Sequence, residues 1–201
     1  FLETVQGADK SDRFFFDYIK ERYEERDDSV PYFSYNLSIQ NHGAYETGST
    51  CEKSYISHEG LTDYSYNILN NYLEGIADTS ARIEEFVNSF KDDDEPVIII
   101  MFGDHMPWMG DSNSVLIDAG INIDTGTEDG FENYYGTMYF IWANDAAEEL
   151  LGSSFNGEGE NMSACFLMPT LFRLAGWEGT PLIKAAEELY EKVSIVNTGS
   201  G

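Results

Sequence analysis

The sequence is poor in basic residues and in long apolar runs. Its 201 residues include 11 Lys and Arg against 37 Asp and Glu, so the formal net charge is -26. A field of this sign repels nucleic acid and anionic membrane surfaces, and we expect neither as a docking partner. No apolar run is long enough to cross a bilayer, and no secretory signal precedes Phe1. We therefore expect targeting and membrane-anchoring segments, including N-terminal helices, to lie outside this chain.

Cysteine is also scarce. Cys51 and Cys165 are the two cysteines, and their wide separation excludes a metal site built on closely spaced thiolates. A disulfide in an extracellular domain and two free thiols both remain open. The hydrophobic fraction of 42% and the aromatic fraction of 14% argue against a disordered chain. The length suits one domain with a sizeable core.

The most apolar run of the chain leads into a candidate metal site. Residues 97–102 are mostly β-branched and lie between Pro96 and Gly103, which predicts a strand buried on both faces. Asp104 and His105 follow directly, at the strand end where ligands collect in open α/β sheets. A carboxylate and an imidazole are good ligands for a divalent cation. The local residues fit a turn aspartate beside a half-buried histidine equally well.

A second predicted strand ends in another histidine. Residues 32–39 alternate between apolar and polar side chains, and Gln40-Asn41-His42-Gly43 follows as a turn. His42 is placed to donate to a substrate phosphate or to act as a general acid. The alternative is a turn histidine packed on Tyr45. Trp108, close after the Asp-His pair, could form a wall of the site, whereas His58 lies in a polar stretch and should be solvent-exposed.

The remaining pattern predicts an α/β fold. We expect helices over residues 12–25, 62–90, 146–151, 163–174 and 181–193, strands over 32–39, 97–102 and 137–143, and loops over 44–60 and 111–136. Pro169 should kink its helix or mark the true start, and Thr180-Pro181 is a helix-starting pair. This order predicts three layers, with helices on both faces of a mostly parallel sheet.

Several segments together resemble the lipoteichoic acid synthase and phosphoglycerol transferase family of the sulfatase (alkaline phosphatase) superfamily. These are residues 33–43, 71–90, 97–105, 139–144 and 168–176, in the family's order, within a resemblance that covers roughly Asp12–Gly176. The resemblance implies a sulfatase-like domain that is incomplete at its N-terminal side. Residues 1–195 would be the C-terminal half of the catalytic domain and 196–201 a flexible tail. An exposed sheet edge left by the missing half could pair two copies of this chain.

The resemblance also implies an activity. Members of this family act at the outer face of the bacterial cytoplasmic membrane and transfer a phosphoglycerol-type group from an anionic lipid or glycan donor. They use one divalent metal, most often Mn²⁺, with Mg²⁺ or Zn²⁺ as alternatives here. Asp104 and His105 map onto metal ligands. His42 maps onto a histidine that contacts the substrate phosphoryl group or glycerol, and we expect Asn41 and Trp108 to bind substrate beside it.

The family's remaining metal ligand, a Glu, and its nucleophilic Thr find no match in this sequence. We therefore expect weak metal binding and no activity from this chain alone. A sulfatase-like hydrolase is a close alternative to the transferase. A non-catalytic acidic cell-surface domain that retains the fold is the alternative from another class.

Overall fold

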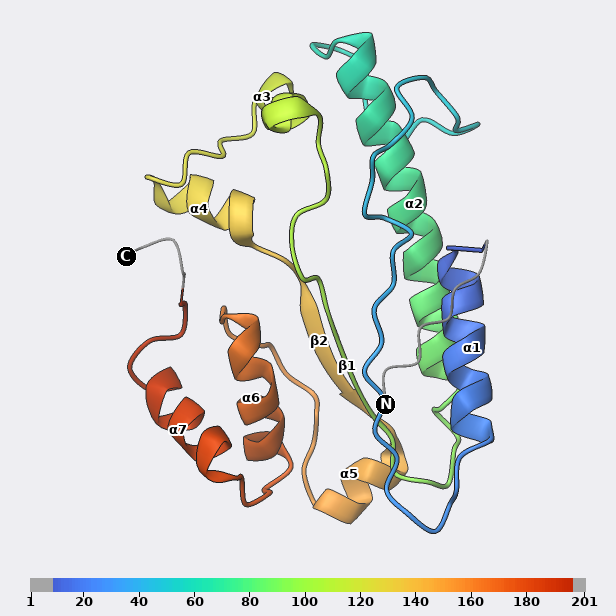
Figure 1. Ribbon diagram of the computed structural model, residues 1–201, viewed down its shortest axis with the longest axis vertical. Coiled ribbons are helices and arrows are strands. Elements are labelled where there is room, and N and C mark those ends of the chain that lie inside the picture. The colour runs from blue at the N-terminus through green and yellow to red at the C-terminus, as the bar shows by residue number, and fades with distance from the viewer. Residues whose placement is uncertain (1–8, 197–201) are drawn as a thin grey trace. The chain divides into compact units, whose positions relative to one another are not determined.

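The computed structural model describes residues 9–196, and its chain divides into two compact units (Figure 1). Unit 1 comprises the chain up to Asn88 together with His105–Gly136, and unit 2 comprises Ser89–Asp104 and the chain from Thr137 onward. The predicted tail lies outside the described residues, apart from residue 196. Within the described part of the chain, no helix is both long and apolar enough to cross a membrane.

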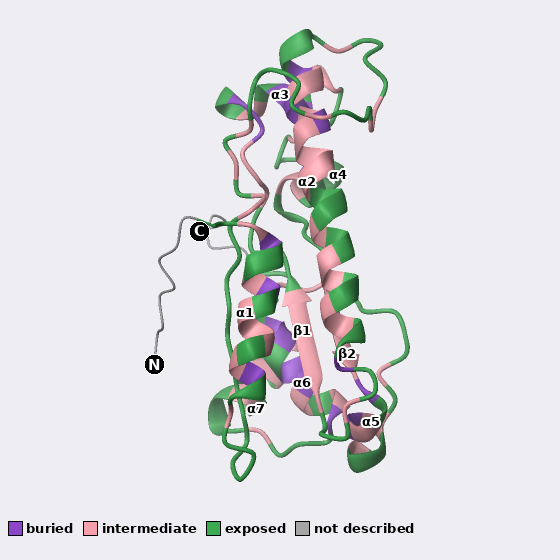
Figure 2. Cartoon of the chain, turned by 90° about the vertical axis from the view of Figure 1, so that its right-hand side faces the viewer, coloured by how far each residue is buried: buried purple, intermediate pink, exposed green. Residues whose placement is uncertain are grey.

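Unit 1 is helical. Its elements are α1 (Asp12–Glu24), α2 (Asp63–Asn88), the short 3-10 segment η1 (Asp111–Asn113), α3 (Ser114–Asp118) and α4 (Glu128–Tyr135). Helices α1 and α2 pack together, with the rings of Phe16 and Phe86 4.9 Å apart. Buried residues, purple in Figure 2, gather where α2 meets α3, and they include Ile68 and Val115. The helix predicted over residues 62–90 therefore contributes Ile68, with Leu69 and Tyr72 beside it, to this core.

Two expectations for unit 1 were wrong. The predicted loop over residues 111–136 contains η1, α3 and α4, because Val115 and Leu116 are buried and the hydroxyl of Thr127 caps α4 by accepting from the N–H of Gly130. The predicted strand over residues 32–39 is extended but unpaired in the described structure (Figure 1). All of residues 32–39 are exposed, and within residues 9–196 no neighbouring strand completes the hydrogen bonds of this segment.

Unit 2 contains the sheet. Its elements are β1 (Ile98–Phe102), β2 (Tyr139–Ala143), α5 (Asp145–Leu151), the 3-10 segment η2 (Ala164–Phe166), α6 (Leu167–Leu174) and α7 (Pro181–Tyr190). Pro169 lies in the first turn of α6 and so marks the start of this helix, which is one of the two alternatives that the sequence allowed. The hydroxyl of Thr180 caps α7 as predicted, by accepting from the N–H of Ile183.

The sheet differs from the mostly parallel one expected. In the described residues β1 and β2 form an antiparallel pair, with Ile98 opposite Ala143 and Phe102 opposite Tyr139. The pairing continues just beyond the two strands. The N–H of Gly103, directly after β1, donates to the carbonyl of Met138, directly before β2, at 3.0 Å. Strand β1 is half-buried rather than buried on both faces, since a two-stranded sheet covers little of it.

Candidate functional site

The turn over residues 40–43 is anchored to α2 by the two amide side chains that precede His42. Gln40 Nε2 donates to Asp78 Oδ2 at 3.1 Å and to Thr79 Oγ1 at 3.2 Å. Asn41 Nδ2 donates to the same hydroxyl at 2.6 Å. A Cβ atom at Gly75 would lie 2.3 Å from Asn41 Oδ1, so the amide sits directly against the helix backbone. The side chain of Asn41 is thus engaged with α2.

The backbone of His42 is fixed from both sides. Its N–H donates to the carbonyl of Ile39 at 3.2 Å, and its carbonyl accepts from the N–H of Trp108 at 3.4 Å. Gly43 has a φ of +89°, and a Cβ there would lie 3.0 Å from Trp108 Cβ. A glycine is therefore needed for both the turn and the close approach of Trp108. The imidazole of His42 is exposed.

Tyr45 reinforces the same turn. Its hydroxyl donates a very short hydrogen bond to the carbonyl of Asn41. Burial, with a smaller contribution from Tyr72, raises the pKa of Tyr45 well above its ordinary value. The hydroxyl therefore stays protonated at physiological pH and continues to donate.

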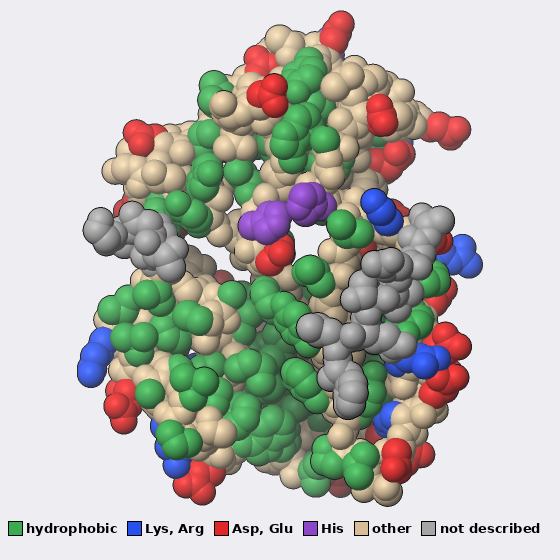
Figure 3. All heavy atoms as spheres, in the orientation of Figure 1, with side chains coloured by type: hydrophobic (Ala, Val, Ile, Leu, Met, Phe, Trp, Pro, Cys, Tyr) green, Lys and Arg blue, Asp and Glu red, His purple; other side chains and the backbone are tan. Residues whose placement is uncertain are grey.

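The structure brings His105 next to His42. Their ring centroids lie 5.6 Å apart in an edge-to-face arrangement with an interplanar angle of 88°. Figure 3 shows purple histidine side chains side by side at the molecular surface. Two histidines separated widely in sequence thus lie side by side and exposed in unit 1.

A neighbouring carbonyl selects the tautomer of His105. Its Nδ1 atom lies 2.8 Å from the carbonyl oxygen of Met106. Because a carbonyl only accepts, this contact favours the proton on Nδ1 and leaves a lone pair on Nε2. An imidazole held in this way is the usual form of a metal-binding histidine.

Asp104 directly precedes His105 and is the last residue of the first segment of unit 2. The preceding Gly103 is held by the hydroxyl of Thr137, which donates to its carbonyl at 2.7 Å. A Cβ at Gly103 would lie 3.0 Å from Thr137 Cβ, so glycine permits this close contact. Asp104 itself is exposed. A carboxylate oxygen and an imidazole nitrogen are each ligands that first-row divalent ions accept.

This pair has no third protein ligand nearby in the part of the chain that the structure describes. Over residues 9–196, no three His, Cys, Asp or Glu side chains group closely enough to hold a metal ion. Two ligands hold a divalent ion weakly, so the described residues fit part of a metal site. Cys51 and Cys165 are free thiols.

The structure also places two other residues that the sequence singled out, Trp108 and His58. Trp108 is partly buried and packs against the apolar cluster around Ile68 and Met109. His58 is exposed, as expected, and its Nε2 lies 2.9 Å from a carboxylate oxygen of Asp63 at the start of α2. It takes no part in the arrangement around His42.

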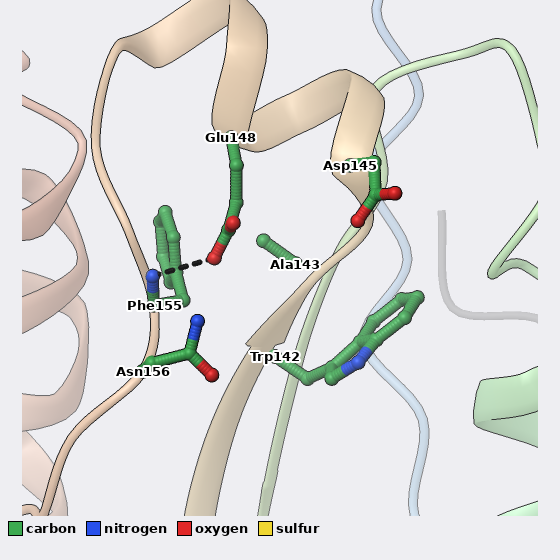
Figure 4. Close-up of a pocket in the computed structure, with 6 residues that line it drawn as sticks. All are labelled: Trp142, Ala143, Asp145, Glu148, Phe155 and Asn156. Carbon is green, nitrogen blue, oxygen red and sulfur yellow. Dashed lines mark hydrogen bonds between the residues drawn. The ribbon is translucent and has the colours of Figure 1, made fainter.

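A separate pocket of about 170 Å³ lies in unit 2 and contains none of the predicted site residues. Figure 4 shows its lining residues at the end of β2 and along α5, including Trp142, Asp145 and Glu148. The carboxylate of Glu148 accepts from the N–H of Phe155 at 2.7 Å. That carboxylate thus holds the loop that follows α5.

Sequence reasoning missed the residues that support the site. The hydroxyl of Thr79 and the bare backbone of Gly75 receive the turn, four residues apart on one face of α2. A glycine within a strong helical pattern often marks a close approach by another part of the chain, and this was the available signal. Nothing in the sequence indicated that the backbone carbonyl of Met106 would contact the His105 ring.

Comparisons with known proteins agree with this description. The sequence matches the Sulfatase family model over residues 3–177. It is 23% identical over 151 residues to a protein of Rhizobium meliloti (strain 1021) provisionally named a cyclic beta-1,2-glucan modification protein, covering 74% of this chain and 22% of that protein.

Among solved structures, the fold is similar to the Streptococcus pyogenes phosphoglycerol transferase GacH, which was determined in complex with sn-glycerol-1-phosphate. The TM-score is 0.65 at 16% identity, over 95% of this chain and 44% of that one. The chain thus spans less than half the length of either relative. The match confirms the predicted sulfatase-like α/β class.

Proposed function

Because the chain belongs to the sulfatase family, we propose that it forms part of a metal-dependent transferase that moves a phosphoglycerol-type group. The observation that carries the proposal is the paired arrangement of His42 and His105, with Asp104 adjacent in sequence. The family match and the fold similarity to a phosphoglycerol transferase support a phosphotransferase or sulfatase-like function.

Sulfatase-family enzymes generally use a divalent metal, and we propose Mn²⁺ here. Asp104 and His105 would hold it, together with ligands supplied from beyond the described residues. When bound, such an ion neutralises charge on the transferring phosphoryl group and lowers the pKa of the nucleophile.

His42 acts as a hydrogen-bond donor in this proposal. Its imidazole is exposed and lies edge-to-face with that of His105, and its backbone is fixed by Ile39 and Trp108. A fixed N–H donor can stabilise negative charge that develops on a phosphoryl oxygen. Asn41 and Trp108 position this donor, and Trp108 would form a side wall for the substrate.

The proposed setting is the outer face of the bacterial cytoplasmic membrane, with an anionic lipid or glycan as donor. An anionic donor must approach a chain with a formal net charge of -26. The cation then has a second role, since it offsets local repulsion at the site.

The test is Mn²⁺-dependent cleavage of a chromogenic phosphodiester by the complete product of the gene, run beside this chain alone. We expect activity in the complete product, its loss on chelation, and none in this chain, because two described ligands without a match for the family's nucleophilic Thr do not make a working site. Absence of Mn²⁺-dependent turnover in the complete product would contradict the proposal.

The second candidate is a non-catalytic acidic surface domain. The lack of a third metal ligand within residues 9–196 and the strong negative charge favour it. It predicts no tight Mn²⁺ binding by the complete product. A micromolar or tighter site that is lost in Asp104→Asn would instead favour the enzyme.

A further inference from the structure

Asp12, the first residue of α1, carries a carboxylate that is buried inside unit 1. The residue is 1% exposed. Helix α1 does not need this carboxylate as its cap, because the hydroxyl of Ser11 already accepts from the N–H of Phe14 at 3.2 Å. Burial of a carboxylate costs free energy unless hydrogen-bond donors offset it. The groups that contact this carboxylate therefore indicate what it does.

The carboxylate of Asp12 contacts α2 through one of its two oxygens. Thr79 Oγ1 donates to Asp12 Oδ2 at 2.5 Å. The other oxygen, Oδ1, is buried and has no hydrogen-bond partner among residues 9–196. The hydrogen bonding of this side chain is therefore concentrated on the hydroxyl of Thr79.

This contact fixes the direction of the Thr79 hydroxyl. Its single proton points to the carboxylate, so its two lone pairs remain for donors. Two amide groups occupy these positions, with Gln40 Nε2 at 3.2 Å and Asn41 Nδ2 at 2.6 Å. An amide turned the other way would bring its oxygen against a lone pair of the hydroxyl. Both amides therefore present their NH₂ groups to Thr79.

A direct contact between α1 and Gln40 agrees with this orientation. The N–H of Asp12 donates to Gln40 Oε1 at 2.7 Å. Gln40 thus binds Asp12 with its oxygen and Thr79 with its nitrogen, and the three residues close a ring of hydrogen bonds. In a closed ring each bond supports the orientation of the next, so removal of one member affects the others.

The same network reaches His42 through Asn41. The NH₂ group of Asn41 lies on Thr79, and its Oδ1 faces the bare backbone of Gly75, where a Cβ would lie only 2.3 Å away. The next residue is His42, whose imidazole is exposed. Asp12 therefore lies at the buried end of a chain of hydrogen bonds whose other end is the turn that carries this imidazole. All of these residues belong to unit 1.

We propose that Asp12 is a positioning residue for His42. Through the hydroxyl of Thr79 it sets the orientation of the Asn41 amide, and this amide fixes the turn that carries the imidazole. The positioning of the turn follows from the contacts within unit 1, whereas its importance for phosphoryl transfer rests on the proposed function.

The first test is made on this chain by NMR, from the signals of the His42 ring and of the Asn41 side-chain amide. In Asp12→Ala the hydroxyl of Thr79 loses its acceptor and turns toward an amide oxygen, so both sets of signals shift. Thr79→Val shifts them too, because it removes the hydroxyl. Thr79→Ser retains the hydroxyl and leaves the signals close to their original positions.

Phe16→Leu is the matched control for a general loss of packing between α1 and α2. Phe16 is 7% exposed, and its ring lies 4.9 Å from that of Phe86, but its side chain takes no part in the hydrogen-bond network. This variant lowers the melting temperature and leaves the signals of Asn41 and His42 in place. If Asp12→Ala does not fold, the comparison of Val with Ser at the partly buried Thr79 tests the same network.

The second test measures phosphodiester cleavage by the complete product of the gene. Asp12→Ala and Thr79→Val each lower kcat/KM about 10-fold or more, since displacement of a positioned group by about 1 Å can cost about 100-fold. Both substitutions break the same chain of contacts. The double variant is therefore no worse than the weaker of the two single variants.

Three results would overturn the proposal: unchanged signals of Asn41 and His42 in Asp12→Ala or Thr79→Val, equal shifts in Phe16→Leu, or losses of kcat/KM that multiply in the double variant. The expected shifts in this chain, together with a complete product that shows no Mn²⁺-dependent turnover, would support the positioning role and refute the proposed function.

Discussion

Asn144 shows how one buried side chain joins several segments of unit 2. Its Nδ2 donates to the carbonyls of Phe90, Asp93 and Glu95, and its Oδ1 accepts from the N–H groups of Val97 and Ala147. The side chain is 1% exposed. Asn144 thus holds the turn that follows α2 against the start of β1. It also caps α5.

Asn144→Ala should lower the free energy of unfolding by about 3 kcal/mol or more, because several buried polar groups lose their partner. Urea denaturation followed by circular dichroism measures this. Asn156→Ala is the control, since the exposed Asn156 bonds only locally to Ser154, and it should change stability by less than about 0.5 kcal/mol. Equal effects of the two substitutions would contradict the assigned role.

Asp118 predicts a pH dependence. Hydrogen bonds from the side chain of Ser65, and from the backbone and hydroxyl of Thr62, lower the pKa of Asp118 from its ordinary value of 3.8. A carboxyl group with a lowered folded-state pKa stabilises the fold above 3.8, and this contribution disappears as the pH falls through the folded-state value. These bonds tie α3 to the start of α2.

We expect the unmodified chain to be more stable than Asp118→Asn at pH 6, and the difference to shrink as the pH falls below 3.8. Denaturant midpoints of both proteins across this range measure it, and the subtraction removes the common effect of the other carboxyl groups. A difference that is constant with pH would show that the carboxylate does not act in this way.

At the level of elements, the fit between α2 and the histidine turn depends on Gly75. Gly→Ala inside a helix normally stabilises by up to about 1 kcal/mol. At Gly75 the new Cβ would meet Asn41 Oδ1 at 2.3 Å, so the Asn41 amide, which is bonded to Thr79, must move. We expect Gly75→Ala to destabilise the chain by about 1–3 kcal/mol and to alter the NMR signals of the His42 ring.

Gly157→Ala is the control for this substitution, because a Cβ there meets nothing within 4 Å. It should leave both stability and the His42 signals unchanged. An increase in stability for Gly75→Ala, without any change at His42, would show that the turn does not need the bare helix backbone.

The helices were predictable because local signals and burial agree. The apolar spacing of α1 and α2 and the Thr180-Pro181 start of α7 all correspond to observed helices. The segment over 111–136 was not predictable in this way, since its glycines and acidic residues hide the short apolar pair Val115 and Leu116 that anchors α3.

The sheet was harder to predict, because strand direction depends on contacts between distant residues. Nothing in residues 97–102 or 137–143 alone shows that Gly103 pairs with Met138 and sets an antiparallel register. For the site, the Asp104-His105 and Asn41-His42 motifs could be read from sequence. Their support by Gly75, Thr79 and the carbonyl of Met106 depends on tertiary contacts.

At the scale of the whole molecule, the formal charge of -26 affects both self-association and the approach of charged substrates. It disfavours self-association and the approach of anionic donors at low salt, and both effects weaken as ionic strength rises. A site that handles phosphate esters on such a surface therefore depends on positive charge close to His42. This is why the metal preference of the complete protein is central to the account.

The most direct test compares three histidine variants of the complete gene product in Mn²⁺-dependent phosphodiester cleavage. His105→Gln should raise the Mn²⁺ concentration needed for activity, and excess Mn²⁺ should partly restore the rate. His42→Ala should lower kcat/KM about 10²-fold or more at every Mn²⁺ concentration, as expected for a lost donor. His58→Ala should have no effect. Retention of full activity by His42→Ala and His105→Gln, as by His58→Ala, would contradict the account.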